Sequence, residues 1–392
     1  MNRRTPDLVL IVFLLLLVGF GLTMVYSASS YTDGIAGFAY KTLLKQAAAV
    51  AFGAVVAAGI AVADLQKVKR FHLLFLGASI VLLLGVFVFG GDGAKGAHRW
   101  INLGAVKFQP AEVVKITVLF SLATWFEQRR DSINDFKRTL APAGAVLVLI
   151  CGLLMAQPDF GSTVVLCGTV VVMAMFAGLD NRKFGMVVGA GLALAPVAIM
   201  AAEYRWDRIL NFLNPVKHCQ DGGYQVCQSM AAYHRGGWSG LGWGDGAAKL
   251  QYLPEPHNDF IAAVVGEELG LFGLVVLLTL YTLVAVRCWR IATRTKDYWG
   301  FLIVSSFTVL TMGQALLNLG VSLGVVPPKG LVLPFISYGA SAMFANLLGV
   351  GLVLNVSSQD PDAAPEPSSA EVTPEPAGSR RGEAHVSVPT RA

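Results

Sequence analysis

Long apolar runs separated by polar segments are the main pattern of this chain. Ten stretches approach or exceed the roughly 17 residues that a helix needs to cross the hydrocarbon core of a bilayer. They are residues 8–26, 47–63, 73–89, 111–126, 141–156, 163–178, 184–202, 260–286, 301–323 and 335–356. Because backbone groups in hydrocarbon must satisfy their hydrogen bonds within the protein, we expect helices throughout. The pattern therefore predicts an all-α integral membrane protein with about ten transmembrane helices.

Clusters of Lys and Arg predict how these helices are oriented. They fall near the amino terminus and in residues 64–72, 127–140, 182–183 and 287–298, all on one side of the predicted spans. Loops that stay in the cytoplasm collect basic residues near the membrane, so we predict that this side and both termini are cytoplasmic. The large loop 203–259, between the seventh and eighth spans, then faces outward.

Composition supports the membrane class and separates a membrane domain from a carboxy-terminal tail. Of the 392 residues, 55% are hydrophobic and 14% are charged, and the mean hydropathy is +0.60, which excludes an ordinary soluble domain. The net charge of +5 follows from the predicted topology and indicates no nucleic-acid partner. Residues 1–357 are predicted to form the membrane domain. Residues 358–392 are rich in Ser, Pro, Glu and Ala, and predict a disordered cytoplasmic tail.

Asp259 ends the large outward loop and begins the eighth apolar span. On a helix, Ala263, Gly266 and Gly270 would fall beneath it on one face, where small side chains would leave a groove. An aspartate in this position is either the N-cap of the helix or a carboxylate kept for chemistry. The spacing alone leaves both interpretations open.

Other charged residues lie within or beside the spans, where an ionisable side chain is costly unless it is paired or functional. Glu112 and Lys115 are three residues apart, so they share a helix face and are predicted to pair. A structural salt bridge and a catalytic role both remain open for them. Glu267 and Glu268 lie further along the eighth span, and one of them is the predicted partner for a cation of the outward loop.

Cysteine spacing predicts a covalent link in the outward loop. Cys219 and Cys227 are eight residues apart, in a compartment where thiols oxidise, and we predict a disulfide. Zinc binding with the histidines of this loop is a weaker alternative, because no close pair of ligands is present. The remaining three cysteines are predicted to be packing residues.

Several polar motifs resemble those of the SEDS family (shape, elongation, division and sporulation). They are GAHRWINLG at 96–104, QPAE at 109–112 followed by Lys115, QPDFGS at 157–162, RILNFLNP at 208–215, LPEPHNDFIAAVVGEELG at 253–270 and LVLPFISYG at 331–339. Together they follow the family order over residues 8–356. The segment VPPKGL at 326–331 resembles the division-type branch more than the elongation-type branch.

The resemblance implies a peptidoglycan glycosyltransferase that polymerises lipid II into glycan strands at the outer face of the bacterial cytoplasmic membrane. It also implies a class B penicillin-binding protein and other divisome proteins as partners, at the division septum. An elongation-type polymerase and a lipid II flippase are the alternatives. Transporters often show two matching halves with helices broken at the midplane, and no such repeat is visible in the sequence.

Within this resemblance, Asp259 is the expected catalytic residue and would act as a general base with inversion at the sugar carbon. The expected substrate-binding residues are Arg99, Gln109, Glu112, Lys115, Asp159, Arg205, Arg208, His257, Lys329 and Ser337. Guanidinium and ammonium groups suit a departing diphosphate. No residues are predicted as metal ligands and no covalent cofactor is expected; a loosely bound Mg²⁺ or Mn²⁺ is a further source of positive charge.

Overall fold

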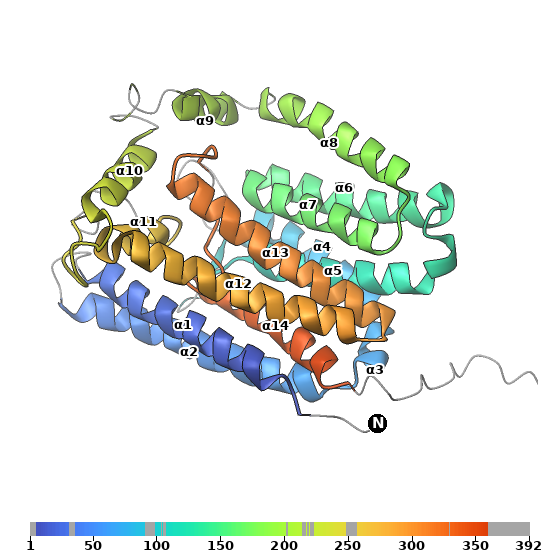
Figure 1. Ribbon diagram of the computed structural model, residues 1–392. Coiled ribbons are helices and arrows are strands. Elements are labelled where there is room, and N and C mark those ends of the chain that lie inside the picture. Colours follow the sequence, from blue (N-terminus) through green and yellow to red (C-terminus); the bar gives the residue numbers. More distant parts are fainter. Residues whose placement is uncertain are drawn as a thin grey trace, which may run out of the picture.

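The computed structural model describes residues 5–30, 36–90, 99–102, 104, 107–200, 203–213, 217, 219, 223–247, 257–328 and 330–359, and every structural statement below concerns these residues. Regular structure is almost entirely helical (Figure 1). The helices are α1 (Leu8–Ser29), α2 (Ala36–Val62), α3 (Leu65–Lys69), α4 (His72–Phe89), α5 (Pro110–Gln128), η2 (Arg130–Ser132), η3 (Phe136–Leu140), α6 (Ala141–Ala156), α7 (Phe160–Phe176), α8 (Asn181–Met200), α9 (Glu203–Leu213), α10 (Tyr224–Gly236), α11 (Ile261–Glu268), α12 (Gly270–Arg294), α13 (Tyr298–Ser322) and α14 (Ala340–Ser357). Two short strands, β1 (Ile101–Asn102) and β2 (Lys107–Phe108), pair antiparallel.

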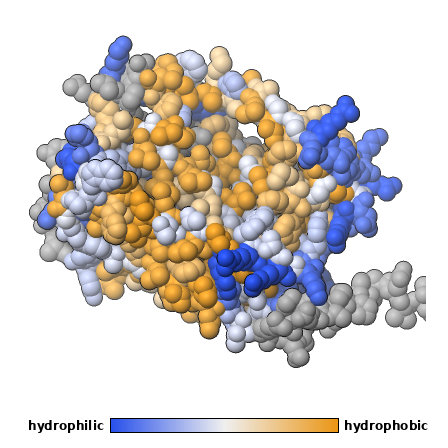
Figure 2. Space-filling view, viewed as in Figure 1, coloured by the Kyte–Doolittle hydropathy of each residue, from blue (hydrophilic) through white to orange (hydrophobic). Residues whose placement is uncertain are grey.

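Seven stretches of the described residues are long and apolar enough to cross a membrane. They lie in α1, α2, α4, η3 with α6, α12, α13 and α14, and α7 is apolar but shorter. Hydrophobic side chains cover much of the face seen in Figure 2, with hydrophilic groups gathered toward its edges. The predicted all-α membrane class is therefore confirmed, whereas the count of ten spans stays a prediction.

The eighth predicted span, residues 260–286, is two helices and not one. α11 ends at Glu268, and α12 begins at Gly270, whose φ of +64° is left-handed. Backbone amides of residues 237–242 donate to the carbonyls of Glu267 and Glu268, and backbone carbonyls of the same segment accept from the first amides of α12. Glycine is needed at position 270 for its conformation, and also because a side chain there would collide with this loop.

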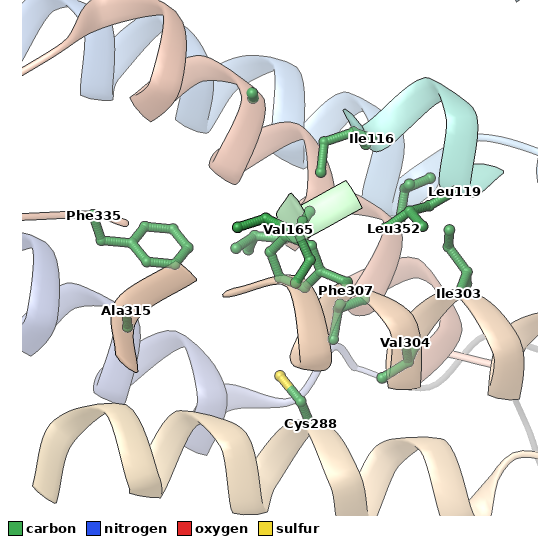
Figure 3. Packing of buried hydrophobic residues seen from close by; sticks show 14 of the residues in the cluster. Ile116, Leu119, Val165, Cys288, Ile303, Val304, Phe307, Ala315, Phe335 and Leu352 are labelled. Carbon is green, nitrogen blue, oxygen red and sulfur yellow. The ribbon is translucent and has the colours of Figure 1, made fainter. Parts of the chain in front are cut away.

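The buried core lies where α5, α7, α12, α13 and α14 meet (Figure 3). Leu119, Val165, Phe307 and Leu352 come from four of these helices and belong to one cluster. In membranes, close contact between helices depends on packing and small residues more than on a hydrophobic driving force. Accordingly, Gly351 of α14 lies directly against the backbone of α2. This core fixes α5 and α13 relative to each other, and both carry polar residues of the site described below.

Loops that the sequence assigns to the cytoplasm lie together at one end of the helices. Lys69 Nζ is 2.9 Å from Glu127 Oε1 and 3.9 Å from Asp297 Oδ2, so it joins three of these loops. Asp7 pairs with Arg287 at 2.8 Å. Burial raises the pKa of Asp7, but hydrogen bonds from Arg287 and from the backbone outweigh it and hold the pKa below its usual value. The loops share one side, as predicted; that this side is cytoplasmic stays a prediction.

Two sequence predictions fall outside the described residues. The proposed tail is described only as far as residue 359, and the amino-terminal basic residues are not described.

Candidate active site

Asp259 lies in a turn, residues 257–260, directly before α11. The N-cap of α11 is Phe260, whose side chain makes no capping hydrogen bond. Asp259 is therefore not the N-cap, which removes one of the two interpretations that the sequence left open. Asp259 is a partly exposed residue, in contrast to the buried residues that follow it in α11.

Asn318 of α13 fixes the backbone of this turn. Its Nδ2 donates to the carbonyl oxygen of Asp259 at 2.8 Å and to that of Leu331 at 2.5 Å. One buried amide thus ties the Asp259 turn to the segment 330–338. Asn318 was not among the residues predicted from the sequence, although a polar residue inside an apolar helix is itself a signal of a structural or functional role.

The segment 330–338 runs beside Asp259 and forms one wall of the site. The amide of Tyr338 donates to the carbonyl of His257 at 2.9 Å, and the two rings make an edge contact with centroids 5.5 Å apart. A methyl group added at Gly330 would lie 3.0 Å from Oδ2 of Asp259. The carboxylate therefore faces the backbone of Gly330, and a larger residue there would press on it.

Ser337, a predicted substrate contact, holds this wall together. Its Oγ donates to the carbonyl of Asn258 at 2.7 Å and accepts from the amide of Leu333 at 2.8 Å. The side chain is buried. Gln46 of α2 supports the same wall, since its amide donates to the carbonyl of Ser337 at 3.2 Å. The hydroxyl of Ser337 thus has two backbone partners, and the structure gives it a scaffolding role.

Phe335 anchors the segment 330–338 in the core, and Figure 3 shows its ring beside Ala315 of α13. Its φ of +65° is uncommon for a residue with a side chain, so it requires support from its surroundings. The hydroxyl of Tyr281 donates to the carbonyl of Pro334, and Gly21 of α1 allows the Phe335 carbonyl to approach closely. The wall beside Asp259 is therefore held in place from α1, α12 and α13.

Glu112 and Lys115 form the predicted pair beneath this wall. Lys115 Nζ is 2.9 Å from Glu112 Oε1 and donates to Gln314 Oε1 at 2.8 Å. Gln314 in turn donates to the carbonyl of Val332 at 2.9 Å. All three side chains are buried. The pairing is confirmed, and the contacts make it a support for the segment 330–338.

Asp159 starts α7 as its N-cap. Its Oδ1 accepts from the amide of Ser162 at 3.1 Å, and its Oδ2 accepts from the Ser162 hydroxyl at 2.8 Å. The side chain is only 2% exposed, so its two oxygens are directed into the protein. Arg99 is held at the same turn, because its Nε donates to the carbonyl of Gln157 at 3.1 Å and its guanidinium also donates to that of Pro158.

The turns at Asp159 and Asp259 are neighbours. A methyl group added at Gly161 would lie 3.0 Å from the side chain of Leu331, and Leu331 is the residue whose carbonyl Asn318 binds. The structure therefore brings Arg99 and Asp159 to the edge of the site that contains Asp259.

Two arginines of α9 reach this region from outside the main group of helices. The guanidinium carbon of Arg205 is 5.7 Å from the ring centroid of Phe160, the first residue of α7. Arg208 donates to the carbonyl of Pro328 at 3.3 Å, two residues before Gly330. The guanidinium group of Arg205 therefore lies beside the Asp159 turn, and that of Arg208 lies beside the residues that lead to Gly330.

Two predicted site residues remain, Gln109 and Lys329. Gln109 precedes α5, and its backbone amide donates to Ser341 Oγ at 3.0 Å. Lys329 lies outside the described residues. Among the residues that the structure does describe, no group of three His, Cys, Asp or Glu side chains is arranged to hold a metal ion.

The groove predicted beneath Asp259 is wrong. Gly266 lies against the ring of Tyr233 from α10, so that a side chain at 266 would overlap it. Ala263 is fully buried, in a cluster with Phe260 and Val321. The small residues serve close packing of α10 on α11, and α10 fills the space that the helical pattern suggested was open.

Two predictions for the outward loop are confirmed. Cys219 and Cys227 form a disulfide with their Cα atoms 5.6 Å apart, which leaves no thiolates there for the zinc alternative. Glu267 pairs with a loop cation, since Arg235 Nε lies 2.6 Å from its Oε1. The Arg235–Glu267 pair holds α10 against the end of α11, next to the break before α12. The disulfide ties Cys219 to Cys227 of α10.

Comparison with known proteins places this geometry in a family. The family model for FtsW, RodA and SpoVE, described as "Cell cycle protein", matches residues 7–361. The chain belongs to the FtsW/RodA/SpoVE family. The resemblance to SEDS proteins seen in the sequence motifs is thereby confirmed.

Relatives in this family cover nearly the whole chain. A protein of Trichlorobacter lovleyi named "Probable peptidoglycan glycosyltransferase FtsW" is 36% identical over 362 residues, which are 90% of this chain and 93% of that protein. One of the same name from Nitrosomonas europaea is 34% identical over 357 residues, covering 89% of this chain and 92% of the other. Both names agree with the division-type branch that the motifs favoured.

Solved structures of this family share the fold. A chain from work described as "Structural coordination of polymerization and crosslinking by a peptidoglycan synthase complex" aligns with a TM-score of 0.76 at 30% identity, covering 90% of this chain and 97% of that one. The rod shape determining protein RodA of Thermus thermophilus aligns with a TM-score of 0.68 at 28% identity, covering 91% and 98%.

Proposed function

We propose that this chain is a division-type peptidoglycan glycosyltransferase that polymerises lipid II at the outer face of the cytoplasmic membrane. The observation that carries the proposal is the position of Asp259, a partly exposed residue whose backbone carbonyl is held by Asn318. Arg205 and Arg208 lie beside Phe160 and Pro328, close to the two turns. Membership of the family and the names of the relatives support this class of activity.

Asp259 is the general base of the proposed reaction. It takes the proton from the acceptor sugar hydroxyl as that oxygen forms a bond to the anomeric carbon of the donor. The bond from that carbon to the lipid diphosphate breaks on the opposite face, so the configuration inverts. Fixing the backbone of Asp259 through Asn318 limits how far the carboxylate moves between turnovers, which favours a reactive geometry.

The departing diphosphate requires positive charge, and Arg99, Arg205 and Arg208 supply it in this proposal. Guanidinium groups bind phosphate oxygens through paired hydrogen bonds. Arg99 is already held by two backbone carbonyls, so little side-chain freedom is lost when it binds an anion. The part of the chain that the structure describes offers no three-ligand metal cluster. A divalent cation would therefore be held mainly by the substrate's own diphosphate, and no step here depends on it.

The proposed partners are lipid II and a class B penicillin-binding protein, which cross-links the strands, with other division proteins at the septum. Likeness to a chain of a peptidoglycan synthase complex supports a transpeptidase partner. A lipid II flippase is the alternative function. The turns that carry Asp159 and Asp259 both lie at helix starts and adjoin each other, which favours chemistry at one surface over transport through the membrane.

The test supplies purified full-length protein with lipid II, with and without the transpeptidase, and measures glycan polymer. Polymer formation supports the proposed enzyme. Movement of labelled lipid II across vesicles without any polymer, in the presence of the transpeptidase, would replace it with the flippase.

A further inference from the structure

α9 carries an exposed apolar stripe. Trp206, Leu210 and Leu213 fall within roughly 60° of one another at about 100° per residue, and they are 45%, 41% and 63% exposed. Among the described helices of eight or more residues, α9 separates apolar from polar side chains most strongly. A short helix with a tryptophan and two leucines on one exposed side needs an apolar environment for that side.

The other sides of α9 have different surroundings. Arg205 and Arg208 extend toward the main group of helices, where they meet the Phe160 ring and the Pro328 carbonyl. Asp207 and Asn211 lie on a third side of the helical wheel, away from the stripe. α9 thus presents one side to the protein, one polar side and one apolar side. A helix that lies flat at the edge of a membrane protein, at the level of the lipid headgroups, needs this three-way division.

The helix before α9, α8, also carries exposed apolar side chains. α9 begins at Glu203, almost directly after α8 ends at Met200, and the two helices are in contact. Along α8, Leu192, Leu194, Val197 and Met200 are between 62% and 70% exposed, as expected for side chains that face lipid. Figure 1 shows α9 beyond the end of α8, apart from the main group of helices.

We propose that α9 is an interfacial helix, with Trp206, Leu210 and Leu213 inserted at the boundary between acyl chains and headgroups of the outer leaflet. Tryptophan is enriched at this level of a membrane. The insertion sets the height of Arg205 and Arg208, which then lie at the level of lipid phosphates. This consequence rests on the proposed function, because a lipid-linked diphosphate is the substrate that those arginines would meet there.

Spin labels test the insertion without any measurement of activity. In full-length protein with Cys151, Cys167 and Cys288 replaced by serine, single cysteines are introduced by Leu210→Cys, Leu213→Cys, Asp207→Cys or Asn211→Cys. The nitroxide-labelled proteins are placed in phospholipid vesicles, and collision with oxygen is compared with collision with a water-soluble nickel chelate. Positions 211 and 213 are the matched pair, because two residues of a helix point about 160° apart.

The expected ratio of oxygen to nickel collisions is at least about threefold higher at positions 210 and 213 than at 207 and 211. Equal ratios at all four positions overturn the insertion. Nickel access at 210 and 213 that is lost only when the transpeptidase is added also overturns it, because the stripe would then be a protein-docking surface.

A second measurement tests the role of the helix in catalysis. Leu213→Glu and Asn211→Glu each add one carboxylate, but only the first places it in the apolar stripe. In vesicles, the KM for lipid II is expected to rise at least about threefold for Leu213→Glu, with kcat within about twofold, and to stay unchanged for Asn211→Glu. An unchanged KM in Leu213→Glu overturns the role in holding the arginines. Failure of the wild-type protein to polymerise lipid II would instead refute the proposed function and leave the spin-label result standing.

Discussion

Two neighbouring turns each place an aspartate just before a helix, yet they use it differently. Before α7, both carboxylate oxygens of Asp159 accept hydrogen bonds from Ser162, and the side chain is buried. Before α11, Asp259 is not the N-cap residue, it is partly exposed, and its backbone carbonyl is held by Asn318.

The two turns thus hold an aspartate before a helix in two different ways. At Asp159 the side chain stabilises the local fold, because both carboxylate oxygens accept hydrogen bonds from Ser162. At Asp259 the backbone carbonyl and the wall 330–338 hold the turn, and the N-cap of the helix is the next residue, Phe260. Position before a helix is the same in both cases, whereas the N-cap role and the exposure of the aspartate differ.

We expect the strongest loss of stability when the buried pair Glu112–Lys115, which supports the segment 330–338, is broken. Lys115→Ala leaves Glu112 buried without its partner and removes a contact of Gln314, so it is expected to cost about 3 to 5 kcal/mol of stability. The free energy of unfolding in detergent measures this. Glu112→Ala together with Lys115→Ala is expected to recover part of the loss. A double variant no more stable than the worse single variant would refute the coupling.

The next prediction compares the loss of kcat when a hydrogen bond is removed at the Asp259 turn with the loss when one is removed at the Asp159 turn. Asn318→Leu removes the donor that holds the carbonyls of Asp259 and Leu331, so kcat is expected to fall about tenfold with KM within about threefold. The matched change at the other turn is Ser162→Ala, which removes one hydrogen bond to Asp159. It should leave kcat within about twofold. Equal losses of kcat in the two folded variants would erase the distinction between the turns.

A smaller effect tests the capping role of Asp159 directly. Asp159→Ala is expected to cost about 1 kcal/mol of stability, whereas Asp159→Asn keeps an acceptor for the helix amide and should cost less. Thermal unfolding of the detergent-solubilised proteins compares them. If the alanine variant is as stable as the wild type, the contacts seen at Ser162 do not contribute to stability.

Features that depend on local spacing were predicted from the sequence. Glu112 and Lys115 pair because three residues on one helix place them on the same face. Cys219 and Cys227 lie close enough along the chain for a disulfide within one loop. The helical membrane class follows from long apolar runs, although α2 begins at Ala36, well before the predicted start at residue 47.

Features that depend on contacts between distant segments were missed or wrong. The helix is interrupted at Leu269, where residues 237–242 form backbone hydrogen bonds with the end of α11 and the start of α12. The apolar sequence on either side of Leu269 does not predict this interruption. The contact of Asn318 with Asp259 joins residues 59 positions apart. The groove beneath Asp259 was inferred from one helix alone, and Tyr233 of α10 fills it.

The most direct measurement compares polymerisation of lipid II by Asp259→Asn and Asp159→Asn in the same assay with the transpeptidase present. Both changes are nearly isosteric and both remove a carboxylate. If Asp259 is the base, its variant remains folded and loses at least about a hundredfold in rate, while the Asp159 variant stays within about threefold of wild type. A folded Asp259→Asn protein that polymerises lipid II at a near-normal rate would contradict the account.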